Sequence, residues 1–472
     1  MDFATDSVRS LAGQVRRREV SAREMVGHAL ARIEALNPTI NAFVAVDGDR
    51  ALAAATRLDE LVAAGDDPGP LAGIPLGVKD LEDAEGYVTT SGSVAFAANP
   101  PATSDSILVA RLVAAGCIVV GKTNTPECAW KADTDNALFG RTRNPWHLDH
   151  SAGGSSGGSA AAIASGMVPL ATGSDGGGSI RIPSSACGLT GVKPSLGRVP
   201  SGGPNPPDWH ELSTKGPMAR RLADVAAALD VVVGPDPTDL RSLPRTEPSW
   251  LSGLDDPRPP ARVAWCPTLG YADVDAEVLA VCERAVGTLE TLGAEIVEVD
   301  AVFDHDPLDA WLTLTGVYNL HTLGRFRDDP EVWSRVDPVL AMVIDGAAAV
   351  SGLQIVEAEN EAHRLNLRLV SLFHDVRLLV TPTMAALPPP AALDGKGLVN
   401  GSEDANWVKL TYPFNLTRSP AATVCAGLSS SGLPVGVQLV GPQHGDAVVL
   451  RAAAALEEAL GFEVVAPMTA PV

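Results

Sequence analysis

The chain has 472 residues, of which 46% are apolar, so it can bury a large hydrophobic core. Its formal net charge of −22 disfavours binding to nucleic acid or to an anionic membrane surface. Six scattered cysteines form no CxxC pair and no cluster with histidines, so neither a disulfide framework nor a zinc site is predicted.

The first part of the chain is predicted to be helical. Apolar residues at helical spacing begin at Val8, and Ser21 with Glu24 forms a capping box before a second helix. Asn37–Pro38 is expected to end that helix. A third helix is predicted over 49–64. The N-terminus lacks a signal pattern, and no apolar run approaches the ~20 residues of a membrane span. A cytoplasmic protein, monomeric or homodimeric, is therefore expected.

Two lysines follow apolar segments and are candidate bases. Lys79 ends the apolar run 71–80, and a lysine buried at a strand end would have a lowered pKa and act as a general base. The alternative is an ordinary surface lysine. After a helix over 106–116, a buried strand begins at 117, and Lys122 is expected in the polar loop that follows it.

A dense pair of Gly/Ser clusters runs from Gly153 to Gly188. The clusters bracket a small-residue helix and a short apolar run, and they leave backbone N–H groups uncovered. The Pro- and Gly-rich stretch 191–217 is expected to be loop.

The remainder alternates helices and strands. A helix is predicted over 222–233, and an irregular connection follows over 235–260. A strand–helix–strand unit is expected over 261–300, a helical segment over 305–375 and a buried strand over 376–384. Two more strands and a helix over 445–460 end the chain. This alternation indicates an α/β fold with a mixed sheet.

Three kinds of chemistry fit the Gly/Ser clusters. A phosphate-binding loop needs Lys and Ser/Thr after its last glycine, and GGSSGGSA has Ala there. An α/β-hydrolase would use Ser155 in G-x-S-x-G as nucleophile, but no buried strand precedes it. In the third interpretation, the glycines at 176–178 form a nest of backbone N–H groups that can hold an oxyanion. Ser179 ends this glycine nest as the nucleophile, and Lys79 supplies the base.

Several ordered motifs together resemble the amidase signature family. They are GIPLGVKD, GKTNTPE, GGSSGGSAAAIASG, GSDGGGSIRIP, PFNLTRSPAAT and GLPVGVQLVG. The resemblance covers nearly the whole chain and includes stand-alone bacterial amidases and hydrolases of nylon-type oligomers. It implies one domain over 1–472 with a large mixed β-sheet flanked by helices on both faces. The signature core spans about 71–217, and the variable pocket segment about 305–375.

The family's functional residues are carried over by motif. The resemblance implies a triad of Lys79, Ser155 as the bridging cis-serine and Ser179 as the nucleophile; the serines are 24 positions apart (179 − 155). Other implied residues support or line the site: Asn124, Asp175 and Arg181. Gly176 stands where many members carry Thr or Ile. The implied oxyanion hole uses the amides of Gly176, Gly177, Gly178 and Ser179.

The resemblance implies hydrolysis of an amide through a Ser179 acyl-enzyme, with no metal and no organic cofactor. Trp311, Thr315 and Tyr318 in the variable segment are expected to bind the substrate or to support the site, and an apolar wall there would favour aryl or alkyl amides. Esters and carbamates are further candidate substrates. The alternatives are the glutamine-hydrolysing component of a tRNA-dependent amidotransferase and an esterase that uses Ser155. The expected partner is a small molecule.

Overall fold

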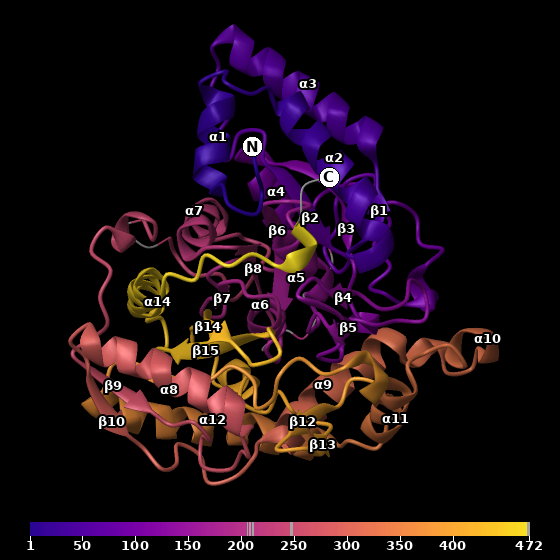
Figure 1. The fold of residues 1–472 in the computed structure, drawn as a ribbon. Helices are drawn as coiled ribbons and strands as arrows, with labels where there is room; N and C mark the ends of the chain where they lie inside the picture. Colours follow the sequence, from indigo (N-terminus) through magenta and orange to yellow (C-terminus); the bar gives the residue numbers. More distant parts are fainter. Residues whose placement is uncertain (205, 207–208, 210–211, 246–248, 470–472) are drawn as a thin grey trace.

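The computed structural model describes residues 1–204, 206, 209, 212–245 and 249–469. Parts of the predicted loop 191–217 and of the connection 235–260 lie outside these ranges. The fold is a mixed α/β architecture, as predicted, with helices packed around two main sheets (Figure 1).

The first sheet has five strands in the order β1-β3-β2-β6-β8. Strand β2 lies parallel to β3 and β6, whereas β1 and β8 pair antiparallel at the edges. Because β2 ends at Lys79 and β6 ends at Asp175, the sheet places the lysine and the glycine nest at one edge. The strands are β1 (Phe43–Val46), β2 (Pro75–Lys79), β3 (Ile118–Thr123), β6 (Leu170–Asp175) and β8 (Thr214–Ala219).

The second sheet has six strands in the order β10-β9-β11-β15-β14-β7. The predicted strand–helix–strand unit is confirmed: β9 and β10 are parallel, and helix α8 connects them. Among the described residues, a bridge between Thr190 and Ala219 links the two sheets. The strands are β7 (Gly191–Lys193), β9 (Arg262–Trp265), β10 (Glu295–Glu298), β11 (Leu379–Pro382), β14 (Ala421–Leu428) and β15 (Pro434–Val440). Two short hairpins are β4 (Arg143–Asn144) with β5 (His147–Ser151), and β12 (Gly397–Val399) with β13 (Ser402–Asp404).

The helices follow the predicted alternation. They are α1 (Val8–Arg16), α2 (Ala22–Ile40), α3 (Gly48–Ala64), α4 (Ile107–Ala114), α5 (Gly157–Ala164), α6 (Arg181–Ala186), α7 (Leu222–Val232), α8 (Ala276–Thr291), α9 (Leu308–Leu323), α10 (Pro330–Trp333), α11 (Pro338–Ala347), α12 (Gly352–Asp375), α13 (Pro413–Leu416) and α14 (Asp446–Leu460). Within the described ranges no single helix has both the length and the apolarity to cross a membrane. Helices α11 and α12 are long and apolar enough only when taken together, and this pair is bent by 109° at the break between them.

Three predicted boundaries differ from the structure. Helix α2 includes Pro38 and continues to Ile40, since a proline in the last turn removes one hydrogen bond without ending the helix. Lys122 lies within β3 rather than in the loop after it. The stretch 191–217 is not all loop, because β7 and the start of β8 occupy its two ends.

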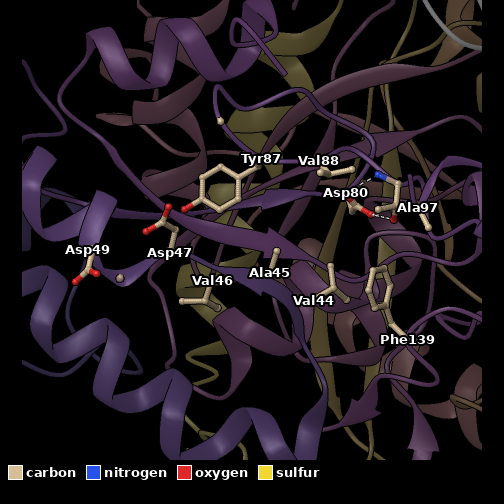
Figure 2. A pocket seen from close by; sticks show the side chains of 13 residues that line it. Val44, Ala45, Val46, Asp47, Asp49, Asp80, Tyr87, Val88, Ala97 and Phe139 are labelled. Carbon is tan, nitrogen blue, oxygen red and sulfur yellow. Dashed lines mark hydrogen bonds between the residues drawn. The ribbon is translucent and has the colours of Figure 1, made fainter. Parts of the chain in front are cut away.

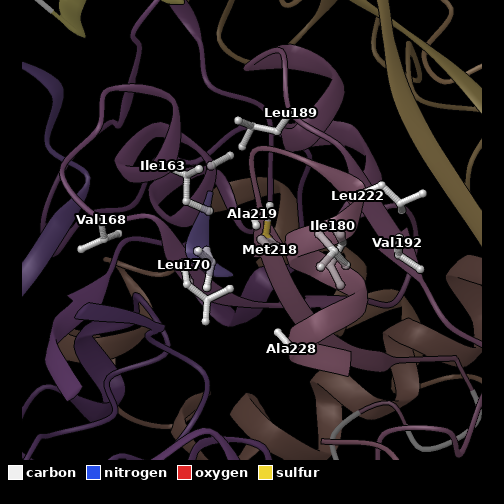
Figure 3. Close-up of a cluster of buried hydrophobic side chains, with 14 of the residues drawn as sticks. Ile163, Val168, Leu170, Ile180, Leu189, Val192, Met218, Ala219, Leu222 and Ala228 are labelled. Atoms are coloured by element: carbon white, nitrogen blue, oxygen red, sulfur yellow. The ribbon is translucent and has the colours of Figure 1, made fainter. Parts of the chain in front are cut away.

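Helix α5 is fully buried and packs across β2, β3, β6 and β8. Its small side chains allow this close approach: a Cβ on Gly158 would overlap the backbone of Asn124, and one on Gly157 would overlap the side chain of Thr134. The surrounding core includes Ile163, Leu170 and Met218 (Figure 3). Helix α5 therefore forms a rigid support beneath the Gly/Ser clusters.

Candidate active site

Lys79 lies at the end of β2, completely buried, and its amine contacts three serine hydroxyls. Lys79 Nζ is 2.7 Å from Ser155 Oγ, 2.9 Å from Ser156 Oγ and 2.9 Å from Ser174 Oγ. Ser155 precedes α5, and Ser174 lies on β6. The two elements thus close on the lysine from either side. The sequence motifs point to Ser155 but not to Ser156 or Ser174.

Burial lowers the pKa of Lys79 to about 7, although the carboxylates of Glu82 and Asp175 act in the opposite direction. No carboxylate forms a direct ion pair with Nζ among the described residues. A substantial fraction of the amine is therefore neutral at physiological pH, when it can accept a proton.

Ser155 and Ser179 line the same cavity, together with Ser174, Gly176 and Trp209. The peptide bond between Gly154 and Ser155 is cis. Ser155 is fully buried, whereas Ser179 is partly exposed to the cavity. The Ser156 N–H donates to the carbonyl of Ser179 at 3.2 Å, which connects the two Gly/Ser clusters. Of the two serines, Ser179 is thus the more accessible from the cavity.

A buried ion pair holds the glycine nest from below. The Asp175 carboxylate accepts from Arg181 Nη2 at 2.8 Å and from Arg181 Nε at 2.9 Å, and both side chains are inaccessible to solvent. Burial alone would raise the pKa of Asp175, but Arg181 and Asn415 hold it well below its usual value. The Asn415 amide also donates to the Asp175 carbonyl at 2.8 Å. Asp175 and Arg181 thus fix the loop and do not face the cavity.

The expectation that Gly178 contributes its amide to an oxyanion hole is wrong. Its N–H donates to Asp175 Oδ1 at 2.8 Å and is no longer available to a ligand. The hydrogen bonds found among the described residues leave the N–H groups of Gly176, Gly177 and Ser179 without an acceptor. These three remain candidates for an oxyanion hole.

Two side chains from distant segments hold the carbonyls of the nest. Trp311 Nε1 donates to the Gly176 carbonyl at 2.9 Å, and Thr411 Oγ1 donates to the Gly177 carbonyl at 2.6 Å. Larger residues do not fit in the nest. A Cβ on Gly176 would lie 2.6 Å from the ring of Trp209. A glycine is therefore required at position 176 as long as Trp209 occupies that space.

Of the two roles predicted for Trp311, Thr315 and Tyr318, binding the substrate or supporting the site, the structure places all three in supporting positions. Trp311 packs on the nest, and Thr315 is buried with its hydroxyl on the Trp311 carbonyl at 2.8 Å. Tyr318 packs into the core around the second sheet. The α9 residues that line the cavity are Asn319 and Thr322. They follow Thr315 at helical spacing, so extending the same helical face by two turns would have found them.

Asn124 does not reach the cavity either. Its side chain donates to Thr142 Oγ1 at 3.0 Å and to the Gly140 carbonyl at 3.1 Å. The main-chain carbonyl of Asn124 accepts a hydrogen bond from the N–H of Gly158 at 3.2 Å. Asn124 therefore supports the start of α5 beneath Ser155.

The second candidate amine, Lys122, is bound elsewhere. Burial lowers its pKa, but its Nζ lies 3.3 Å from Asp80 Oδ1 and donates to the Glu82 carbonyl at 2.6 Å. Asp80 borders a different and larger cavity of about 640 Å³, where Tyr87 points toward Asp47 (Figure 2). Neither Ser155 nor Ser179 lines that cavity, so Lys122 is not positioned to activate either serine.

Comparison with known proteins identifies the class to which this fold and site belong. The sequence model of the Amidase family matches residues 24–450. The protein is a hydrolase that acts on amide C–N bonds, and it belongs to the amidase signature family.

The relatives cover nearly the full chain. An acylamidase from Rhodococcus erythropolis is 37% identical over 96% of this chain and 94% of its own. The sequence of a glutamyl-tRNA(Gln) amidotransferase component from Synechococcus sp. (strain CC9605) is 35% identical over 97% of each chain.

Two solved structures share the fold. A bacterial aryl acylamidase superposes with a TM-score of 0.90 at 31% identity, covering 96% of both chains. A 6-aminohexanoate cyclic dimer hydrolase in complex with its substrate superposes with a TM-score of 0.87 at 29% identity, covering 99% of this chain and 100% of its own.

Proposed function

We propose that the protein is a serine amidohydrolase that works through an acyl-enzyme on Ser179. Neutral Lys79 accepts the proton of Ser155, and Ser155 accepts the proton of Ser179. Ser179 Oγ then attacks the substrate carbonyl, while the amides of Gly176, Gly177 and Ser179 stabilise the oxyanion. Ser155 returns a proton to the leaving amine. Water releases the acyl group through the same relay.

One observation carries this proposal: the buried amine of Lys79 is 2.7 Å from Ser155 Oγ. A hydroxyl alone is a weak nucleophile, and the lowered pKa of Lys79 supplies a base at neutral pH. The esterase alternative with Ser155 as nucleophile has less support. Ser155 is fully buried, and none of the described histidines hydrogen bonds to either serine.

The proposed substrates are apolar aryl or alkyl amides. Leu81 and the ring of Trp209 form an apolar wall, while Asn319 and Ser213 supply hydrogen-bonding groups. The names of the acylamidase and aryl acylamidase relatives agree with this choice. Esters and carbamates present the same carbonyl with another leaving group, so we include them as candidates. The similarity to an amidotransferase component keeps glutamine as the competing substrate.

A fluorophosphonate probe followed by peptide mass spectrometry tests the nucleophile. We expect the adduct on Ser179, and no adduct in Ser179→Ala. Labelling of Ser155 in the wild type would contradict the proposal. A substrate panel of anilides, aliphatic amides, glutamine, esters and carbamates tests specificity. Efficient glutamine hydrolysis with no anilide turnover would favour the amidotransferase role.

A further inference from the structure

Helix α12 presents an unpartnered apolar face that repeats every seven residues. It is the longest helix described, with 24 residues, and at ~1.5 Å per residue it spans about 36 Å. One face packs into the core through Ala358, Leu365, Leu369 and Phe373. The opposite face, named here the α12 seam, is exposed along its whole length and consists of Leu353, Val356, Asn360, His363, Leu367, Val370 and His374.

The four aliphatic side chains of the α12 seam are all strongly exposed and lie on one helix face. Leu353 is 68% exposed and Leu367 is 52% exposed, while Val356 and Val370 are 49% and 47% exposed. In heptad notation the leucines occupy position a and the valines position d. This 3.5-residue spacing is the pattern by which one helix packs along another. The α12 seam therefore has two exposed apolar pairs, Leu353 with Val356 and Leu367 with Val370, separated by Asn360 and His363. Exposed apolar surface repeated along one helix face marks an interaction site.

We propose that the α12 seam is the interface of a homodimer, in which the α12 helices of two copies pack antiparallel. An antiparallel pairing of a with d positions matches the chemistry of every layer. Leu353 meets Val370 of the second copy, and Leu367 meets Val356. The polar residues meet in the middle, Asn360 against His363, where a hydrogen bond fixes the register.

The charges beside the seam favour the same arrangement. The three glutamates of α12 precede its two arginines: Glu357, Glu359 and Glu361 come before Arg364 and Arg368, and Asp375 ends the helix. The antiparallel register places Glu357 beside Arg364 of the second copy, whose guanidinium Nε also donates to Glu361 Oε2 of its own chain at 2.7 Å. Two-fold symmetry repeats this group of charges. Glu359 falls beside Asn366. The apolar pattern of the α12 seam is thus complementary to itself, and so are the charges of Glu357 and Arg364 beside it.

A groove gives the second copy's Leu353 a place to bind. It lies beside the C-terminal half of α12, has a volume of about 290 Å³, and is lined by Val370, Phe373, His374 and Pro442 among others. In the proposed register Leu353 of the second copy meets Val370 at the rim of this groove. The groove and Leu353 lie toward opposite ends of the same helix, so Leu353 of the same chain cannot reach the groove, whereas Leu353 of a second, antiparallel copy can.

Sedimentation velocity on the full chain over the micromolar range tests the proposal. We expect the mass to rise from that of a 48.8 kDa chain toward twice that value. The variant Leu353→Glu/Leu367→Glu should raise the dissociation constant at least about tenfold while keeping wild-type amidase activity. The matched control is Val339→Glu/Met342→Glu, which introduces the same charges at exposed apolar positions of α11 outside the α12 seam. A monomer at all concentrations, or equal loss of dimer in both variants, would overturn the proposal.

Disulfide trapping tests the antiparallel register. The double variant Leu353→Cys/Val370→Cys should form an intermolecular disulfide under mild oxidation, and neither single variant should. Five native cysteines are buried and Cys128 is half-buried, so the wild type serves as the background. Trapping by each single variant would show a parallel pairing and overturn the proposed register.

Discussion

The ring of Trp311 lies directly against Gly177, so that a Cβ on this glycine would be 2.7 Å from Cζ2 of the indole. The same indole holds the carbonyl of Gly176 through its Nε1. The conformation of the nest therefore depends on a helix that is more than 130 residues away in sequence.

We expect Gly177→Ala to reduce kcat at least about tenfold on anilide substrates while the protein stays folded. The added methyl group must displace either the nest or Trp311, and both changes move the candidate oxyanion amides. Steady-state kinetics and thermal unfolding measure the two effects. Gly177→Ala/Trp311→Leu should recover part of the activity because the smaller side chain leaves room. Unchanged kcat in the single variant would show that the nest tolerates the shift.

The pH dependence of activity should follow the titration of Lys79. Its pKa is lowered to about 7 by burial, and only the neutral amine can accept a proton. We therefore expect kcat/KM to fall tenfold per pH unit below about pH 7 and to level off above it. Lys79→Met should lose at least about 10²–10⁴-fold in kcat with a normal circular dichroism spectrum. An activity that is flat between pH 5 and 9 in the wild type would exclude Lys79 as the base.

Ser174 should act as a positioning residue for the lysine. Its hydroxyl is 2.9 Å from Lys79 Nζ but, unlike that of Ser155, it is not assigned a proton-transfer step. We expect Ser174→Ala to lower kcat by less than about tenfold and to shift the acidic limb of the pH profile. Ser159→Ala is the matched control, because Ser159 is also a buried serine but hydrogen bonds to Thr172 and Thr123 instead. A pH profile identical to wild type would contradict this role.

Asn319 should influence substrate binding, whereas Thr315 on the same helix should not. Asn319 lines the cavity and accepts from Trp209 Nε1 at 3.3 Å. We expect Asn319→Ala to raise KM for anilides by about threefold to tenfold, as the ring of Trp209 loses its partner. Thr315→Val, the control, should leave KM within about twofold, since its hydroxyl bonds only within α9. Equal effects in the two variants would indicate general destabilisation of α9.

Stability should depend on a carboxyl group remote from the cavity. Burial raises the pKa of Glu457 on α14 to about 7, although Thr190 and the Leu222 N–H donate to it. A raised carboxyl pKa means that the folded state holds the proton more tightly than the unfolded state. This stabilisation is therefore present at low pH and is lost as pH rises through about 7.

Glu457→Gln should remove this pH dependence. We expect the free energy of unfolding of the variant, taken relative to wild type, to be about 1 kcal/mol higher at pH 8 than at pH 5. Thermal unfolding at the two pH values measures the difference. Glu458→Gln, on the exposed side of α14, is the control and should show no such gain. A larger gain at pH 5 than at pH 8 would reverse the sign and contradict the argument.

Local patterns predicted most of the elements, because helix periodicity, the Ser21–Glu24 capping box and the apolar runs each depend on neighbouring residues. The residues around Lys79 were only partly predictable. Ser155 stands in a recognisable motif, but Ser174 reaches the amine because β6 lies beside β2. The bond from Gly178 to Asp175, and the placement of Asn319 instead of Trp311 in the cavity, arise from tertiary packing that spacing alone does not encode.

The attachment of the nest to Trp311 and Thr411 also bears on when the enzyme becomes active during folding. The carbonyls of Gly176 and Gly177 are held by residues 135 and 234 positions away. Contacts this distant in sequence form late, because a long loop must close before they are made. Lys79 and Ser174 lie on strands β2 and β6 of the first sheet, and Ser155 lies just before α5. The two serines are 76 and 95 positions from Lys79 in sequence, so their contacts with it can form earlier. Amidase activity should therefore appear in the last stage of refolding, after the fluorescence and circular dichroism of the sheets have already recovered.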